Sequence, residues 1–153
     1  MNDLCYERTR GRQVVSTDRA RLDLALVHRQ LAGTYWAAGI PRDVVVRSIE
    51  NSLAFGLYDG DAQIGFARVV TDLATYGYLA DVFVVEERRG QGLGDWLVES
   101  IMLHPQLQGL RRFALFTRDA APLYARHGFR TPDGPSGYME IVKRGLYAAP
   151  ASE

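Results

Sequence analysis

A glycine-rich loop between an apolar run and an amphipathic run constrains the fold more than any other feature of this chain. The segment VFVVEERRGQGLGDWL (82–97) begins with four apolar residues, continues through two arginines, and has Gly90, Gly92 and Gly94 at alternate positions. Glycine adopts positive φ without strain and lets the backbone approach a bulky ligand. The following helix begins with unpaired N–H groups and a partial positive charge, so the pattern predicts a phosphate site. The alternative is a tight connection that merely requires glycine.

Two familiar phosphate-binding patterns are missing from this loop. The nucleoside triphosphate loop requires Gly, four residues and then Gly-Lys-Ser/Thr, but counting from Gly90 brings Asp95 to the second glycine position. The dinucleotide fingerprint requires Gly-x-Gly-x-x-Gly or Ala, and its last position falls on Asp95 or, counted from Gly92, on Leu97. A nucleotide-binding dehydrogenase is therefore disfavoured.

Composition restricts the class of protein. The chain has 153 residues, 47% of them hydrophobic, which suits one domain with a real core. Eighteen basic residues balance eighteen acidic ones, so no general attraction to nucleic acid or to membranes is expected. Cys5 is the single cysteine, which excludes an internal disulfide and a cysteine zinc site. Since neither a spanning segment nor a signal peptide is evident, we expect a cytoplasmic protein.

The order of predicted elements indicates one α/β domain over residues 1–153, with a core of about 13–143 and loose ends. Asp18 and Pro41 suit the starts of the first two helices, and Asp59-Gly60-Asp61 suits a hairpin turn. Helices are expected over 19–32, 41–51, 92–103 and 119–128, strands over 13–16, 76–85 and 110–117, and hairpins over 52–72 and 129–144. A mixed sheet with helices on both faces is the expected packing.

Two motifs carry a resemblance to a known family. The loop reads Arg89-Gly90-Gln91-Gly92-Leu93-Gly94, and LYARHGF (123–129) places a tyrosine before a Gly-Phe pair. With these motifs the sequence resembles the GCN5-related N-acetyltransferases, whose Gln/Arg-x-x-Gly-x-Gly/Ala signature follows the fourth strand and binds the pyrophosphate of acetyl-coenzyme A. The resemblance covers roughly residues 13–143. It implies a mixed, mostly antiparallel sheet with splayed fourth and fifth strands, and acetyl-coenzyme A as cosubstrate.

The resemblance also implies a cofactor site. Backbone N–H groups of residues 89–94 would hold the pyrophosphate, while the Arg89 side chain would either fold back on the loop or meet a phosphate. The pantetheine arm would lie along the backbone of three residues of the fourth strand, namely Phe83, Val84 and Val85. The N–H of Val84 would polarise the thioester carbonyl as an oxyanion donor does. Asp119 stands where many relatives have an asparagine that touches pantetheine, but it would serve equally as a helix cap.

Tyr124, within LYARHGF, is the expected general acid. A phenol with a pKa of about 10 is able to protonate a leaving thiolate at neutral pH, although a lone helical tyrosine often serves only packing. The general base stays open, and its candidates are Asp72, Asp81, Glu86 and Glu50. Each of these four would serve equally as a cap or an ion-pair partner. The sequence offers no convincing nucleophile–base pair, so direct attack by a primary amine is expected.

The acceptor pocket is expected at the break between the first two helices. TYWAAGI places Tyr35 and Trp36 there, with Phe55 and Arg68 facing them from the sheet. Trp36 would serve equally as a core anchor. An inward-pointing Arg68 would favour a carboxylate on the acceptor. The acceptor itself, a small-molecule amine or a peptide, is left open.

The three histidines lack metal-ligand spacing, so no metal is expected. His104 suits a cation at a helix end, and His127 either tunes Tyr124 or simply ends its helix. Relatives often form dimers, so a homodimer is an expectation without a visible interface. The alternative function is a non-catalytic module on the same fold that senses coenzyme A or binds a protein.

Overall fold

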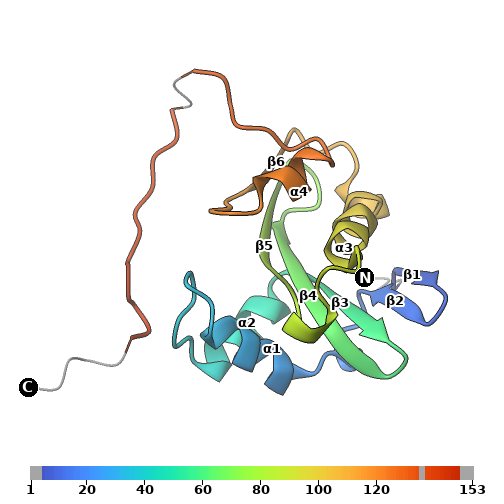
Figure 1. Cartoon of the computed structure of the whole chain (residues 1–153). Helices are drawn as coiled ribbons and strands as arrows, with labels where there is room; N and C mark the ends of the chain where they lie inside the picture. Colours follow the sequence, from blue (N-terminus) through green and yellow to red (C-terminus); the bar gives the residue numbers. More distant parts are fainter. Residues whose placement is uncertain (1–4, 135–136, 149–153) are drawn as a thin grey trace, which may run out of the picture.

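Six strands form one mixed sheet in the computed structural model, which describes residues 5–134 and 137–148 (Figure 1). The strands are β1 (Glu7–Arg10), β2 (Gln13–Ser16), β3 (Leu53–Asp59), β4 (Ala62–Thr71), β5 (Tyr76–Val84) and β6 (Arg112–Leu115). Their order in the sheet follows the chain, and every pair is antiparallel except the parallel β5 and β6. The predicted mixed, mostly antiparallel sheet is confirmed.

Helices cover both faces of this sheet, as predicted. They are α1 (Leu24–Ala32), α2 (Arg42–Glu50), α3 (Leu93–Met102) and the short α4 (Ala121–Ala125). Figure 1 shows α1 and α2 on one side of the sheet and α3 on the other. Helix α3 buries Leu93, Leu97 and Ile101, spaced four residues apart, and α1 buries Val27 and Leu31 in the same way. This spacing puts each apolar set on one helix face, which packs on the sheet. None of the helices in the described part of the chain is long and apolar enough to cross a membrane.

Strands β5 and β6 separate halfway along β5, and this separation is the predicted splay. Their pairing runs from Tyr76 with Arg112 to Leu79 with Leu115 and goes no further, whereas β5 continues to Val84. On the other side of β5, the pairing with β4 shifts register opposite Asp81, whose φ is 58°. A β-bulge of this kind bends a strand and increases its local twist. The bulge therefore explains why β5 turns away from β6 beyond Leu79.

Two elements near the N-terminus differ from the prediction. Residues before 13 were expected to be loose, but Glu7–Arg10 forms β1 and pairs with β2. The helix expected over 19–32 is split into a 3-10 turn and α1. Asp18 accepts a hydrogen bond from the Ala20 N–H in the turn, and Asp23 accepts one from the Leu26 N–H at the start of α1. Two capping residues five positions apart make two short elements in place of one helix.

The C-terminal part differs most. Helix α4 and strand β6 are shorter than the expected 119–128 and 110–117, and the hairpin expected over 129–144 is wrong, since its described residues form no strand. Pro132 cannot donate to a ladder, and Gly134 and Gly137 take positive φ values of 67° and 72°, which interrupts an extended run. Residues 137–144 form no helix or strand and lie outside the sheet (Figure 1).

Candidate active site

The glycine loop ends in an open helix N-terminus. Gly90 and Gly92 have φ values of 78° and 76°, and Gly92 is the N-cap of α3 without any side-chain capping bond. A Cβ atom added to either glycine would meet nothing within 4 Å, so neither is required by packing. Gly94 has no positive φ, and its added Cβ would touch Leu123 at an ordinary 3.9 Å. The expected positive φ is thus found at two of the three glycines, beside open space at the positive end of α3.

Two arginines hold the loop against the sheet. The Arg89 Nε donates to the Val84 carbonyl at 3.1 Å, so its side chain folds back on the loop, which is one of the two arrangements expected. The Arg88 guanidinium pairs with the Asp59 carboxylate at 2.7 Å. This bond and one from Arg12 hold the pKa of Asp59 below its usual range. Both contacts fix the loop before any ligand arrives.

Three residues were expected to contact pantetheine, namely Phe83, Val84 and Val85. Only Val84 directs its backbone polar groups toward the gap between β5 and β6. The Val85 N–H donates to the Ile64 carbonyl at 2.9 Å, and the Phe83 carbonyl lies on the β4 side, beside Gly65. Successive strand residues direct their polar groups to opposite neighbours, so those of Val84 face away from β4. The side chains of Phe83 and Val85 are buried in the core.

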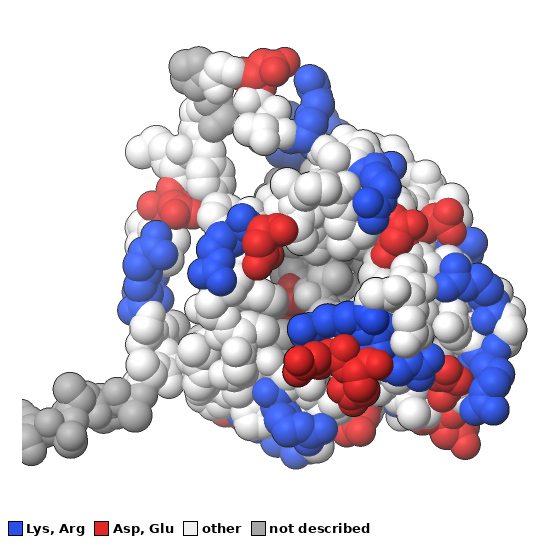
Figure 2. Space-filling view, in the orientation of Figure 1, with Lys and Arg blue, Asp and Glu red and all other residues white. Residues whose placement is uncertain are grey.

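A pocket of about 390 Å³ occupies the gap where the strands separate. It brings together six residues singled out from the sequence, namely Tyr35, Trp36, Arg68, Asp81, Asp119 and Tyr124. Sequence reasoning missed Tyr78 and the segment 115–117, which also line it, because only the splay shows that these backbones face one space. Figure 2 shows this face of the molecule, hollowed near its centre and carrying charges of both signs.

An ion pair fixes one side of this pocket. The Arg68 Nε donates to the Asp81 Oδ2 at 2.6 Å, and the Trp36 Nε1 donates to the Asp81 Oδ1 at 2.8 Å. Arg68 also donates to the Ser52 hydroxyl at 3.1 Å. The two charged side chains are only 19% and 9% exposed, so the pair is shielded from water. Arg68 does line the pocket, but its charge is already balanced, which removes the argument for a carboxylate on the acceptor.

Each of the four carboxylates considered as bases is either already hydrogen-bonded or outside the pocket lining. Asp72 accepts bonds from the Thr75 hydroxyl and from the N–H groups of residues 74–76, which hold its pKa well below the usual range. Asp81 lines the pocket, but both its oxygens already accept hydrogen bonds. Glu50 and Glu86 are exposed and lie outside the pocket lining. None of the four stands free beside Tyr124.

Tyr124 lies in α4 and is 9% exposed. Burial raises the pKa of its hydroxyl above the ordinary value of about 10, and the nearby Asp119 carboxylate adds to the rise. The Phe129 ring packs edge-on against Tyr124 and Phe113, with centroids 6.2 and 5.4 Å away. Gly128 permits this return of the chain, since its φ is 96°. The Gly-Phe pair of the motif therefore positions the tyrosine.

Two alternatives for the residues around Tyr124 are resolved. The N-cap of α4 is Ala120, whose N–H donates to the Thr117 hydroxyl at 3.0 Å, so Asp119 does not cap the helix. Asp119 is exposed and lines the pocket. The His127 ring forms a hydrogen bond of 2.9 Å with the Asp95 carboxylate, which links the end of α4 to α3. Its partner is therefore Asp95 and not Tyr124.

Phe55 and His104 correct two further expectations. Phe55 is fully buried and packs edge-on against His104 at 5.7 Å, whereas Arg68 pairs across the sheet with Ala54, the preceding residue. Adjacent strand residues point to opposite faces, so Phe55 faces away from the acceptor pocket. His104 is 4% exposed, and burial lowers its pKa, so it does not act as the expected cation. Within residues 5–134 and 137–148, no three His, Cys, Asp or Glu side chains gather as metal ligands would.

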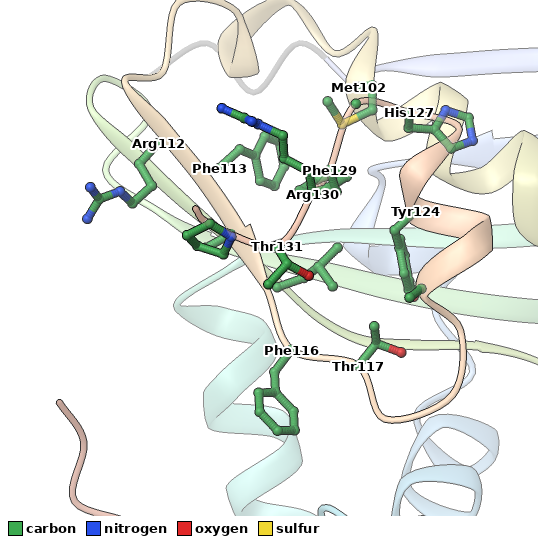
Figure 3. Close-up of a pocket in the computed structure, with 15 residues that line it drawn as sticks. Met102, Arg112, Phe113, Phe116, Thr117, Tyr124, His127, Phe129, Arg130 and Thr131 are labelled. Atoms are coloured by element: carbon green, nitrogen blue, oxygen red, sulfur yellow. The ribbon is translucent and has the colours of Figure 1, made fainter. Parts of the chain in front are cut away.

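A second pocket, of about 680 Å³, lies beside β6 (Figure 3). It shares Tyr124 and the segment 115–117 with the acceptor pocket. Its other boundaries come from Met102 at the end of α3 and from the chain after α4, including Phe129 and Thr131. The segment 115–117 and Tyr124 therefore separate two hollows.

Comparisons with known proteins agree with this geometry. Residues 50–131 match the family model described as Acetyltransferase (GNAT) domain. A curated protein of Gibberella zeae, "Putative acetyltransferase FG08082", is 33% identical over 164 aligned residues, covering 90% of this chain and 92% of that one. The crystal structure of xcc2953 from Xanthomonas campestris pv. campestris, described as belonging to the gnat family, is 49% identical, with a TM-score of 0.86 over 90% of this chain and 97% of its own. A structure from Clostridium acetobutylicum, determined with acetyl-CoA, shares the fold at 17% identity and a TM-score of 0.59, covering 78% of this chain and 86% of that one. The chain belongs to the GNAT family of acetyltransferases.

Proposed function

We propose that the protein transfers the acetyl group of acetyl-coenzyme A to a primary amine on a small molecule or a peptide. One observation carries the proposal: β5 and β6 separate beyond Leu79 and Leu115, Tyr124 lines the gap, and the first turn of α3 lies beside Val84 at the end of β5. A ligand with a pyrophosphate at one end and a thioester at the other fits such a gap. The fold shared with a Clostridium protein determined with acetyl-CoA supports this donor.

The cofactor would bind mainly to backbone groups of the protein. The N–H groups of residues 90–94 would hold the pyrophosphate, helped by the positive end of α3 and by the open space beside Gly90 and Gly92. The pantetheine amides would lie along the free edge of β5, where a strand without a neighbour offers unpaired polar groups. Asp119, at the pocket, would accept a pantetheine N–H.

The chemistry would be a direct displacement without a covalent enzyme intermediate. The Val84 N–H would donate to the thioester carbonyl oxygen, where negative charge develops. The amine attacks the carbonyl carbon as the free base, the carbon–sulfur bond breaks, and the sulfur takes the proton of the Tyr124 hydroxyl. The proton lost by the amide nitrogen returns to Tyr124 through water. A raised pKa keeps Tyr124 protonated at neutral pH, as a general acid requires.

The acceptor would carry its amine on an apolar or aromatic body. Tyr35 and Trp36 line the pocket and are 46% and 48% exposed, so their rings are available to a ligand. The Arg118 guanidinium lies 3.7 Å from the Tyr35 ring centroid and covers one of its faces. Because the Arg68 charge is balanced by Asp81, the pocket supports an amine without a carboxylate partner for Arg68.

The Tyr124→Phe variant tests this proposal, because it removes the acidic hydroxyl and keeps the ring. We expect turnover, followed by release of free thiol across a panel of amines, to fall about 10²- to 10⁴-fold. The dissociation constant of coenzyme A, measured by calorimetry, is expected to stay unchanged. Tyr76→Phe is the matched control, since Tyr76 is exposed and lines neither pocket.

Turnover by Tyr124→Phe at the wild-type rate would remove Tyr124 from the mechanism. Coenzyme A binding by the wild type without turnover of any amine would favour a non-catalytic sensor.

A further inference from the structure

Two walls of the acceptor pocket are joined by a single contact between an arginine and an aromatic ring. One wall is the segment after β6, and the other is the break between α1 and α2. The guanidinium carbon of Arg118, from the first wall, lies 3.7 Å from the ring centroid of Tyr35, from the second. A planar cation at this distance stacks on the face of the ring, where the electrostatic potential is negative. The Tyr35 ring thus already receives a guanidinium, which the chain itself supplies.

Arg118 has no other charged or hydrogen-bonding partner to hold it there. Its side chain is exposed and forms no hydrogen bond or ion pair within the part of the chain that the structure describes. A cation–π contact at an exposed site is weak, because water competes for the cation. A guanidinium brought by a ligand is therefore able to take the place of Arg118 on the ring.

The Tyr35 ring, in contrast, is held in one orientation beside the proposed acid. The Trp36 ring packs against it in a T-shaped arrangement, with centroids 5.0 Å apart and planes at 84°. Trp36 is in turn anchored by the hydrogen bond from its Nε1 to the Asp81 carboxylate. Tyr35 and Tyr124 line the same pocket, and Tyr35 adds, after burial and Asp119, to the raised pKa of Tyr124. A ligand stacked on Tyr35 is therefore close to the reacting centre.

The charges that line the pocket also favour a cation. Arg68 and Asp81 neutralise each other. The Asp119 carboxylate lines the pocket, is exposed, and forms no hydrogen bond or ion pair with any other described residue. The pantetheine amide proposed as its partner is neutral and would leave this negative charge uncompensated. Since the reacting amine attacks as the free base, a second group on the acceptor would have to supply the balancing positive charge.

Building on the acetyl transfer proposed for this protein, we propose that the acceptor carries a guanidinium group in addition to its reacting amine. The guanidinium would stack on Tyr35 in place of Arg118, and the apolar body between the two groups would lie against Trp36. Tyr35 would then determine specificity, and Arg118 would cover the site until an acceptor arrives.

Calorimetric titration of the wild type with three amines, in the presence of coenzyme A, tests this site without requiring turnover. The probes are (4-aminobutyl)guanidine, its uncharged isostere (4-aminobutyl)urea, and 1,5-diaminopentane, whose second ammonium matches the position of the guanidinium carbon. We expect the guanidine to bind roughly five- to tenfold more tightly than the urea, and more tightly than the diamine, because a planar cation stacks on the ring. Binding no tighter than that of either other probe would overturn the proposal.

Variants assign the effect to the two side chains. Tyr35→Leu should abolish the preference for the guanidine over the urea, whereas Tyr35→Phe keeps the aromatic face and should retain it. Arg118→Gln removes the competitor and should raise the affinity for the guanidine roughly two- to fivefold. Arg111→Gln is the matched control for the lost charge and should leave the affinity unchanged, since Arg111 is exposed and lines neither pocket.

Two results with these variants would contradict the proposal. One is a preference for the guanidine that survives Tyr35→Leu, and the other is an affinity of Arg118→Gln that does not exceed the wild-type value. Turnover is scored separately by release of free thiol. Thiol release with amines but no preference for the guanidine would refute the guanidinium site and leave the acetyl transfer in place. Preferential binding of the guanidine without thiol release from any amine would uphold the site on Tyr35 and contradict the transfer.

Discussion

Asp81 shows how much a single side chain depends on its partners. The sequence predicts that an ionised carboxylate inside an apolar strand is costly unless it is partnered. The partners are Arg68 and Trp36, which come from a neighbouring strand and from the break between two helices. Sequence reasoning placed both near the acceptor pocket but could not pair them, because the pairing depends on the bulge at Asp81.

The face on which a strand residue lies is the least predictable property at this scale. Arg68 and Phe55 were both expected in the acceptor pocket, but a shift of one position sends a side chain to the other face. Register places Arg68 opposite Ala54, and so Phe55 enters the core on the other face, against His104. The positive φ of Gly90 and Gly92 was easier to predict, because glycine permits it locally, although Gly94 of the same loop lies in α3 without it.

His104 predicts a pH dependence of folding stability. Its Nδ1 accepts the Gln106 N–H at 3.1 Å, its ring packs against Tyr6, and burial lowers its pKa below the ordinary value of 6.5. The unfolded chain therefore binds the proton more readily than the folded one. This contribution to stability is complete above the unfolded pKa and is lost as pH falls toward the lowered folded pKa.

The His104→Asn variant should flatten that dependence, since its amide oxygen is able to accept the Gln106 N–H and does not titrate. Thermal unfolding of both proteins between about pH 7 and pH 5 measures the difference, and slopes are compared because Asn loses ring contacts at every pH. Equal slopes for the two proteins would mean that His104 protonates equally easily in the folded and unfolded states.

The strand before the glycine loop, the loop itself and the helix after it could each be predicted from the sequence. The apolar run before the loop and the four-residue spacing of Leu93, Leu97 and Ile101 after it are local patterns with a single structural reading. The split of the first expected helix was not predictable, because Asp18 and Asp23 are equally good caps. The hairpin expected over 129–144 failed because Pro132, Gly134 and Gly137 interrupt the extended run, which the alternation of apolar residues does not reveal.

Two glycines with similar backbone conformations are expected to differ in how an alanine substitution affects coenzyme A binding. Gly92 and Gly109 have φ values of 76° and 78°, and an added Cβ at either meets nothing within 4 Å. Alanine at either position should therefore cost a similar ~1–2 kcal/mol of stability. Only Gly92→Ala places a methyl group at the proposed pyrophosphate site, so its coenzyme A affinity should fall about tenfold, or ~1.4 kcal/mol.

Calorimetric titration of both variants with coenzyme A measures this difference, with Gly109→Ala as the matched control for backbone strain. Equal affinities would place the pyrophosphate elsewhere than at the start of α3. A loss in both variants would show that strain alone weakens binding.

At the scale of the whole molecule, the family and the fold class were predictable from two motifs in the right order. The motifs are local, and between them they fix the strand, the loop, the signature helix and the tyrosine of α4. The acceptor is beyond the motifs, which describe the cofactor side of the site.

The central claim is that the loop and the gap beside it bind acetyl-coenzyme A, and thermal unfolding of the wild type with separate ligands tests it most directly. The ligands are acetyl-coenzyme A, coenzyme A, NAD and ATP, each in excess. A ligand at about a hundred times its dissociation constant stabilises the folded state by about 2.7 kcal/mol, which raises the melting temperature of a domain this size by several degrees. We predict a rise with the two coenzyme A forms and none with NAD or ATP. No rise with either coenzyme A form, or a rise only with NAD or ATP, would contradict the assignment of the loop and of the site built on it.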